Sequence, residues 1–256
     1  MTRLSRPALP QVVAHRGNAA EYPENSLPAL RSALELGARW VEFDVQLTKD
    51  RVPVVLHDDN LARTTGIDRS VFETTAAELE DMRANESTRF AGRYTDIGVP
   101  TLRQAADLLR AFPEAGAFVE LKRSSLRQFG HEVMVSKVHE ALGDVLARST
   151  VISFDLPAIH YARHAIGASI GWVLPQYDSV TALKCEALTP EYLFCDLERL
   201  PADGSRLWRG PWCWAIYEVT SLSTALSLAA RGVALIETMR VRDLMRELRR
   251  ARSAAH

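Results

Sequence analysis

Cysteine is scarce in this chain of 256 residues, which contains only Cys185, Cys195 and Cys213. The number is odd and the spacing does not match a zinc site, which excludes a disulfide framework and a structural zinc module. We therefore expect three reduced cysteines in the core of an intracellular protein.

The sequence also lacks an excess of charge and any long apolar run. Its 31 Lys and Arg residues balance 32 Asp and Glu residues, a formal net charge of −1, which argues against a nucleic-acid binder with a basic face. No stretch approaches the roughly 18 apolar residues of a membrane span. No signal-peptide run precedes the first strand candidate. We expect a cytoplasmic, unprocessed protein that binds no nucleic acid, and its oligomeric state stays open.

What the sequence does contain is an alternation of short β-branched or aromatic runs with amphipathic segments. Three such segments, 26–38, 101–112 and 221–232, begin at Ser or Thr, as capped helices do. Alternation of this kind predicts a parallel sheet with crossover helices. The strand candidates are 12–14, 39–46, 53–57, 117–121, 150–153, 169–174, 192–195, 212–218 and 233–237.

Nine strands are one too many for an eight-stranded barrel, and one short connection accounts for the excess. Only TKDR separates DVQL, at the end of the second run, from VPVVLH in the third, whereas a parallel crossover needs about a dozen residues. These two strands are therefore expected to form a hairpin. A two-residue turn at Asp50-Arg51 would pair Lys49 with Val52 and place His57 opposite Asp44.

Residues 59–100 form the one long region without strong periodicity. In a barrel, such a segment is usually an insertion at the active-site end. Apolar residues make up 47% and charged residues 25% of the chain, as in a soluble globular protein. We expect a single domain over residues 1–256.

Three carboxylates lie in or at the ends of apolar strand candidates. Glu42 and Asp44 form an E-x-D pattern within WVEFDV, and Glu120 ends AFVE. A lone E-x-D is more often an exposed edge or an ion pair. Here the apolar flanks predict burial, which is costly without a compensating cation. Together these acids would suit Mg²⁺ or Ca²⁺.

Histidines and cations follow the same strand candidates. His15 and His57 end VVAH and PVVLH, where a barrel places its catalytic groups. Arg16 follows His15 and Lys122 closely follows Glu120; they are either solvated charges or phosphate ligands. A lone histidine is usually a core residue, but two beside three carboxylates favour metal-assisted attack on a phosphate ester. Other histidines are assigned no role: His131, His139, His160, His164 and His256.

The order and spacing of these motifs resemble the glycerophosphodiester phosphodiesterase family. The resemblance covers nearly the whole chain and is densest in its first half. It is carried by HRG at 15–17, PENS at 23–26, EFDVQLTKD at 42–50, HDDNLARTTG at 57–66, PTL at 100–102, ELK at 120–122 and SF at 153–154.

The resemblance implies a TIM-type (β/α)8 barrel with a small insertion after the second strand region. It implies metal-dependent hydrolysis of glycerophosphodiesters to glycerol 3-phosphate and an alcohol, with a cyclic phosphodiester expected on the route. The implied metal ligands are Glu42, Asp44 and Glu120; the acid and base are His15 and His57; the phosphate ligands are Arg16 and Lys122. A lysophospholipase D with the same machinery and a catalytically silent phosphodiester-binding barrel are the alternatives.

The chain also departs from the family pattern near its end. Met239 stands where the family has an aspartate, and Trp214 is followed by Ala215, Ile216 and Tyr217 instead of the usual T-V-N. These changes put the preference for a glycerol head group in question, more than the catalytic chemistry.

Two further expectations concern aromatic side chains and the end of the chain. Trp172, Trp214 and Tyr217 are either core residues or the lining of a pocket for a choline-like cation or an acyl chain. The arginine-rich segment 240–256 is expected to form a final amphipathic helix. Weak contact of this helix with an anionic membrane surface is the alternative.

Overall fold

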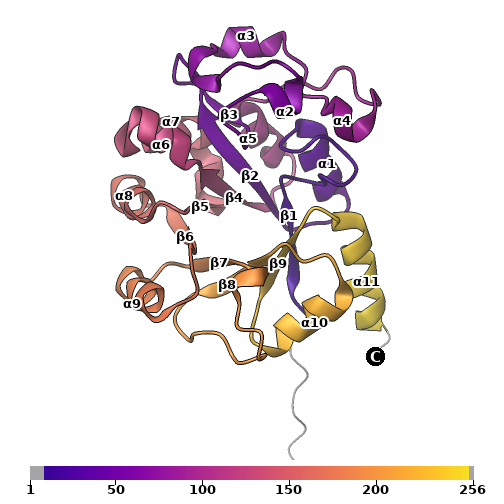
Figure 1. Cartoon of the computed structure of the whole chain (residues 1–256), viewed down its shortest axis with the longest axis vertical. Coiled ribbons are helices and arrows are strands. Elements are labelled where there is room, and N and C mark those ends of the chain that lie inside the picture. The colour runs from indigo at the N-terminus through magenta and orange to yellow at the C-terminus, as the bar shows by residue number, and fades with distance from the viewer. Residues whose placement is uncertain (1–8, 254–256) are drawn as a thin grey trace, which may run out of the picture.

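A closed ring of parallel strands forms the centre of the computed structural model, which describes residues 9–253 (Figure 1). The strands pair in the order β1–β9–β8–β7–β6–β5–β4–β2, and a β1–β2 pairing closes the ring. The expected TIM-type barrel is confirmed. The strands are β1 (Gln11–His15), β2 (Trp40–Leu47), β3 (Pro53–Val55), β4 (Gly116–Leu121), β5 (Ser149–Ser153), β6 (Ser169–Val173), β7 (Tyr192–Asp196), β8 (Cys213–Tyr217) and β9 (Leu235–Thr238).

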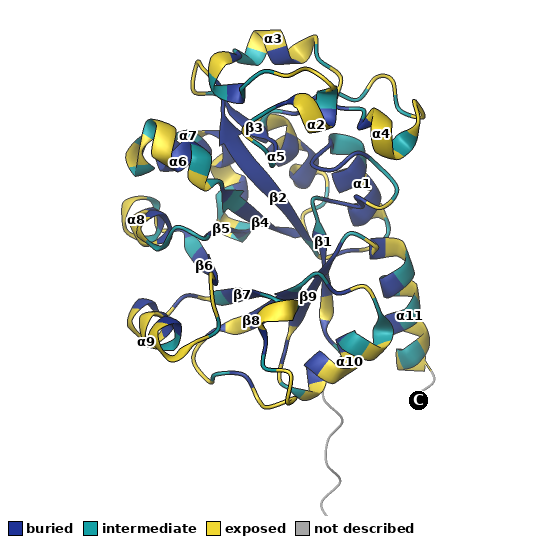
Figure 2. Ribbon diagram, in the orientation of Figure 1, coloured by how far each residue is buried: buried dark blue, intermediate teal, exposed yellow. Residues whose placement is uncertain are grey.

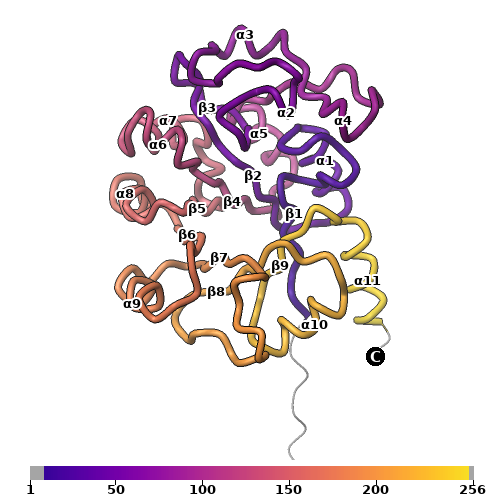
Figure 3. The backbone as a smooth tube through the Cα atoms, viewed as in Figure 1, coloured from indigo at the N-terminus to yellow at the C-terminus, as the bar shows by residue number. Residues whose placement is uncertain are grey.

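Helices surround the ring, and the chain makes one circuit, so that its first and last strands lie side by side (Figure 3). The outer helices are α1 (Leu27–Glu35), α5 (Leu102–Arg110), α6 (Arg123–Phe129), α7 (His131–Leu142), α8 (Leu156–Ile166), α9 (Ser179–Leu188), α10 (Leu222–Ala230) and α11 (Val241–Ser253). The three helices expected from the sequence are α1, α5 and α10, and the arginine-rich segment forms α11.

Side-chain caps explain where the three expected helices begin. The hydroxyls of Ser26, Thr101 and Ser221 each accept a hydrogen bond from the backbone N–H three residues later. Each cap satisfies one of the N–H groups that the first helical turn leaves without a partner.

The hairpin of β2 with antiparallel β3 is confirmed, but the predicted register is wrong by one residue. Val45 pairs with Val55, and the N–H of Leu56 donates to the carbonyl of Asp44. Leu56 rather than His57 therefore lies opposite Asp44. The turn has three residues instead of two, and Arg51 takes a left-handed φ of 61° at its end, the conformation that a three-residue hairpin loop needs.

Alternation along the strands divides the core into two layers. Side chains inside the ring form a small apolar cluster, whereas the larger cluster lies between strands and helices; the strands are buried throughout most of their length (Figure 2). The inner cluster consists of Val13, Phe118, Ile152, Val173, Phe194, Ala215 and Leu235. Two residues beyond three of these come His15, Glu120 and Glu237, so the inward-facing row changes from apolar to ionisable toward the carboxyl ends of the strands.

The segment between β3 and α5 folds as short elements at the carboxyl end of β2, above the ring in Figure 1. It contains α2 (Ala62–Thr65), the 3₁₀ turn Val71–Glu73, α3 (Ala76–Glu80) and α4 (Ser87–Phe90). Its apolar side chains form a separate small cluster with Val54 and Leu56. This placement agrees with the expected insertion at the active-site end.

Within residues 9–253, no helix has both the length and the apolar character needed to cross a membrane. The first eight residues, to which much of the signal-peptide expectation applies, lie outside the described range, as does His256.

Gly17 shapes the turn that follows β1, and replacing it should destabilise the protein. Its φ is +81°, and a Cβ would lie 2.6 Å from the backbone carbon of Ala29 in α1. We expect Gly17→Ala to lower the free energy of unfolding by about 2 kcal/mol, or about 4–8 °C in Tm. Thermal unfolding measures this. Gly66→Ala is the matched control, since Gly66 also has a positive φ but open space around it; an equal loss in both variants would contradict the role assigned to close packing.

Candidate active site

The residues predicted from the sequence converge at the carboxyl ends of β1 and β4, in the middle of β2 and in the segment just after β3. Six of the seven line one cavity of about 180 Å³, and Asp44 contacts two of those six. Parallel strands bring their carboxyl ends to one face of a barrel, which explains why residues distant in sequence meet here. The cavity is lined by His15, Arg16, Glu42, His57, Glu120, Lys122, Ile152, Phe154, Val173, Phe194, Tyr217 and Glu237.

The three predicted carboxylates form one group. Glu42, Asp44 and Glu120 each offer an oxygen, and these oxygens lie within 4.8 Å of one another. Glu42 and Asp44 are each 1% exposed, because the E-x-D spacing directs both side chains to the inner face of β2. Glu42 Oε1 is buried without a hydrogen-bond partner among residues 9–253. A cluster of hard oxygen atoms with an unpartnered acceptor fits a divalent cation.

Two cations already compensate Asp44. Lys122 Nζ lies 3.0 Å from Asp44 Oδ1 and 3.0 Å from Glu120 Oε1, and Arg16 Nε lies 3.2 Å from Asp44 Oδ2. Burial disfavours the charged carboxylate, but Lys122 and Arg16 outweigh it and hold the pKa of Asp44 well below its usual range. Glu42 has no such partner for Oε1, so burial and the neighbouring Asp44 raise its pKa well above the usual value.

The two histidines line the same cavity and have different carboxylate partners. His15 Nδ1 contacts Glu218 Oε1, and its Nε2 lies 3.8 Å from Glu42 Oε2. Burial opposes a charge on His15, but Glu237, Glu218 and Glu42 outweigh it and raise its pKa to about 10. His57 Nδ1 lies 2.6 Å from Asp58 Oδ1. This contact orients the His57 ring, and among residues 9–253 no side chain forms a hydrogen bond with Nε2, the nitrogen that would transfer a proton.

The loop that contains PENS helps to position the carboxylates of the site. Asn25 donates from Nδ2 to Asp44 Oδ2 at 2.8 Å and accepts from the N–H of Asp44 at 3.2 Å. Its own φ is 57°, and its N–H donates to the carbonyl of Arg16. An asparagine tolerates this left-handed conformation better than most residues. Asn25 thus links the turn after β1 to the carboxylates on β2.

The insertion contributes an arginine that contacts two acidic residues near the site. Arg63, on α2, donates to Glu24 Oε1 at 2.7 Å and to Asp58 Oδ2 at 2.6 Å. Asp58 in turn contacts His57. Arg63 therefore connects the PENS loop to the carboxylate that orients a candidate catalytic histidine. Sequence reasoning missed this link, because nothing along the chain indicates that 24 and 63 are neighbours.

Sequence reasoning also missed two acidic residues, Glu218 and Glu237. Glu237 lies on β9, is 3% exposed and joins His15 and Glu42 in a second group of ligand atoms within 4.8 Å of one another. The signal for Glu237 was present: an acid within the apolar run ALIET resembles Glu120 in AFVELK. Glu218 follows β8 and is identified only by its contact with His15.

Only one of the three proposed pocket aromatics lines the cavity. Tyr217 does so, together with Phe154 and Phe194. Trp172 and Trp214 belong instead to the core outside the ring. They sit one residue from an inward-facing position on β6 and β8, and alternation turns them toward the helices. Both tryptophans are core residues, and the prediction that they line this cavity is wrong.

Comparisons with known proteins identify the relatives of this chain. The model of the glycerophosphoryl diester phosphodiesterase family matches residues 15–182. A glycerophosphodiester phosphodiesterase of Caldanaerobacter subterraneus is 39% identical over 98 residues, 38% of this chain and 40% of that protein. One from Bacillus altitudinis is 36% identical over 127 residues, 50% of this chain and 51% of that protein. The matches thus span about half the length of these curated relatives, or less.

A solved structure is similar over almost the whole chain. It is a phosphodiesterase of Oleispira antarctica in complex with the product sn-glycerol-3-phosphate, with 25% identity and a TM-score of 0.80. The match covers 94% of this chain and 97% of that one. The family model includes all seven site residues predicted from the sequence. The chain therefore belongs to the glycerophosphoryl diester phosphodiesterase family.

Proposed function

We propose that this protein hydrolyses glycerophosphodiesters to glycerol 3-phosphate and an alcohol with the help of a bound divalent cation, Mg²⁺ or Ca²⁺. One observation carries the proposal: two histidines, three carboxylates and two cationic side chains meet in and around one cavity of about 180 Å³. The phosphodiesterase of Oleispira antarctica binds the product sn-glycerol-3-phosphate in a similar fold, which supports the same product here.

Glu42, Asp44 and Glu120 would hold the cation. When bound, it would neutralise charge on the phosphate oxygens and stabilise the transition state. Arg16 and Lys122 line the same cavity and keep their charge, because nearby carboxylates raise the pKa of both groups despite burial. Their N–H groups would bind the phosphate and oppose the negative charge that builds up during reaction.

The two histidines would divide the proton transfers. His57, oriented by Asp58, would take the proton of the attacking hydroxyl on its free Nε2. His15 has a pKa of about 10 and so carries a proton at neutral pH, which it would give to the leaving alkoxide. The pKa of the leaving alcohol is far above neutral pH, so its alkoxide is a poor leaving group unless it receives this proton.

The attacking group is proposed to be a hydroxyl of the substrate's own glycerol. Its oxygen would bond to phosphorus as the bond to the leaving alcohol breaks, giving a cyclic phosphodiester. Water would then open the ring, with the two histidines exchanging roles. A substrate in which the hydroxyl beside the phosphate is methylated tests this route. We expect no turnover with it; hydrolysis at the usual rate would overturn the cyclic step.

The first experiment is an assay of glycerol 3-phosphate release from glycerophosphocholine and glycerophosphoethanolamine. We expect release with Mg²⁺ or Ca²⁺ and its loss in EDTA, restored by added metal. The absence of release with any metal would contradict the proposal. Lysophospholipids belong in the same assay, because a lysophospholipase D would use the same groups and the apolar wall of Phe154, Phe194 and Tyr217.

A further inference from the structure

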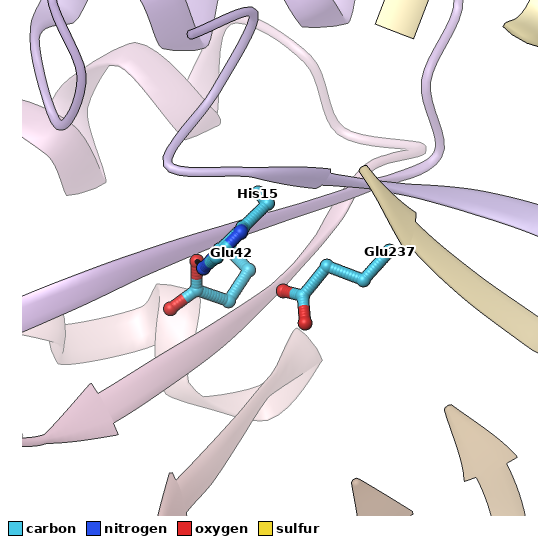
Figure 4. Close-up of side chains that lie close together, drawn as sticks. All are labelled: His15, Glu42 and Glu237. Atoms are coloured by element: carbon cyan, nitrogen blue, oxygen red, sulfur yellow. Dashed lines mark ion pairs between the residues drawn. The ribbon is translucent and has the colours of Figure 1, made fainter. Parts of the chain in front are cut away.

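The carboxylates of Glu42 and Glu237 and the imidazole of His15 form a group that the proposed mechanism does not fully use. They come from β2, β9 and β1 and face one another inside the ring (Figure 4). One atom from each lies within 4.8 Å of the others. We refer to these three residues as the His15 group. Only Glu42 is shared with the Glu42, Asp44 and Glu120 cluster.

Two buried carboxylate oxygens in the His15 group have no hydrogen-bond partner among residues 9–253. They are Glu42 Oε1 and Glu237 Oε1. Leaving a buried carboxylate oxygen unpaired costs free energy unless a cation compensates it. Asp44 differs, since Lys122, Arg16 and Asn25 contact its two oxygens. The demand for a cation is therefore concentrated on the β9 side of the cavity.

Glu218 prepares the imidazole of His15 for a ligand role. It contacts Nδ1, so the second ring nitrogen, Nε2, is the one directed toward Glu42 at 3.8 Å. Histidines that bind metals commonly donate their other ring N–H to a carboxylate, which fixes the tautomer and the ring orientation. The Glu218–His15 pair has this arrangement.

We propose that His15 Nε2, Glu42 and Glu237 form a second cation site, selective for an ion that accepts a nitrogen ligand, such as Zn²⁺ or Co²⁺. One imidazole and two carboxylates suit these ions, whereas Mg²⁺ and Ca²⁺ prefer oxygen alone. The ion competes with the proton on His15 Nε2. If the proposed function holds, on which this consequence rests, the filled site inhibits hydrolysis by withdrawing His15 from proton transfer.

Cobalt binding tests the site without any assay of activity. Co²⁺ is titrated into the protein in saturating Mg²⁺, which is expected to fill the oxygen site, and the visible absorption of bound Co²⁺ is recorded. We expect Glu237→Gln to weaken this binding at least about tenfold. Glu120→Gln, the same change in the neighbouring cluster, should leave it within about threefold of wild type. Unchanged binding in Glu237→Gln would overturn the proposal.

A second variant guards against a folding defect at the buried Glu237. Glu218 has a side chain that is 41% exposed, so Glu218→Gln should fold, which a thermal melt confirms. It should weaken Co²⁺ binding by about tenfold through the orientation of His15. Full affinity in a folded Glu218→Gln would overturn the assignment of His15 as a ligand.

Inhibition gives the link to activity. Zn²⁺ added to the Mg²⁺-supported reaction should inhibit wild type, and Glu237→Gln should need at least about tenfold more Zn²⁺ for the same fractional loss of its own rate. The two proposals fail separately. Cobalt binding that depends on Glu237, without hydrolysis by wild type, sustains the site and refutes the function. Hydrolysis by wild type, together with cobalt binding that does not depend on Glu237, sustains the function and refutes the site.

Discussion

His57→Ala should lower kcat by about 10²–10⁴-fold and change the affinity for a non-hydrolysable glycerophosphodiester analogue by less than about threefold. The reason is that His57 is proposed to move a proton, and a positioned acid or base contributes that factor to the rate. The phosphate would still meet Arg16 and Lys122, which line the same cavity. Steady-state kinetics and calorimetric titration of the analogue measure the two quantities.

The same pair of measurements separates an enzyme from a silent phosphodiester-binding barrel. A binder would show no turnover in wild type and unchanged affinity in the variant. His160→Ala is the matched control, because His160 is exposed on α8 and outside the cavity; its kinetics should equal those of wild type. Full turnover in His57→Ala would show that another group is the base.

Glu42→Gln should lower kcat/KM by about three orders of magnitude and at the same time stabilise the metal-free protein. The loss of rate follows from the proposed cation, whose stabilisation of transition-state charge is worth several kcal/mol, with about 1.4 kcal/mol for each factor of ten. The gain in stability follows from the buried Oε1 of Glu42, which has no partner among residues 9–253. Its amide replacement removes a negative charge that Asp44 and Glu237 repel.

The stabilisation should be about 1–3 kcal/mol, or about 3–10 °C in Tm, and should depend on pH. The pKa of Glu42 is raised in the folded state. Protonation of Glu42 therefore stabilises the folded wild type fully below the unfolded pKa of about 4.3. This contribution to the free energy of unfolding is lost as pH rises through the folded pKa. The difference between Glu42→Gln and wild type should therefore be small near pH 4.5 and grow toward pH 8. Melting curves in EDTA measure it.

Glu114→Gln is the control for this series, since the Glu114 side chain is 89% exposed and its substitution should change neither rate nor Tm. If Glu42→Gln were less stable than wild type at pH 8 in EDTA, the buried carboxylate would have to be satisfied by its surroundings. The interpretation of Glu42 as an uncompensated charge would then be wrong.

Features that depend on neighbours along the chain could be predicted from the sequence. Three predicted helices begin at their predicted caps, Ser26, Thr101 and Ser221. Such caps can be predicted because capping involves groups only three residues apart. The hairpin of β2 and β3 followed from the length of its connection alone. The register of the hairpin could not be predicted in this way. The observed three-residue loop, with Arg51 at positive φ, and a two-residue loop differ by one residue, and the residues of this stretch are equally polar in both.

The approach of residues from distant strands could be predicted only in part. Glu42, Asp44 and Glu120 meet because parallel strands align their carboxyl ends, and an acid in an apolar run is visible in any sequence. Glu237 also lies in an apolar run, ALIET, and so follows the same rule, although the sequence analysis did not select it. For Trp172 and Trp214, residue type alone did not predict which face of the strand each side chain occupies. A shift of one residue along a strand reverses the direction of a side chain.

The barrel, its capped helices and the chemical types gathered at its active-site end can be predicted from the sequence, because they follow from local periodicity and from strand alternation. Which acid faces which base depends on how distant segments pack in the folded chain. Glu237 on β9 lies beside His15 on β1, Glu218 orients His15, and Arg63 of the insertion reaches Glu24. Such pairings depend on barrel closure, which brings β9 beside β1, and on the path of loops over the surface. Neither leaves a periodic signal along the chain.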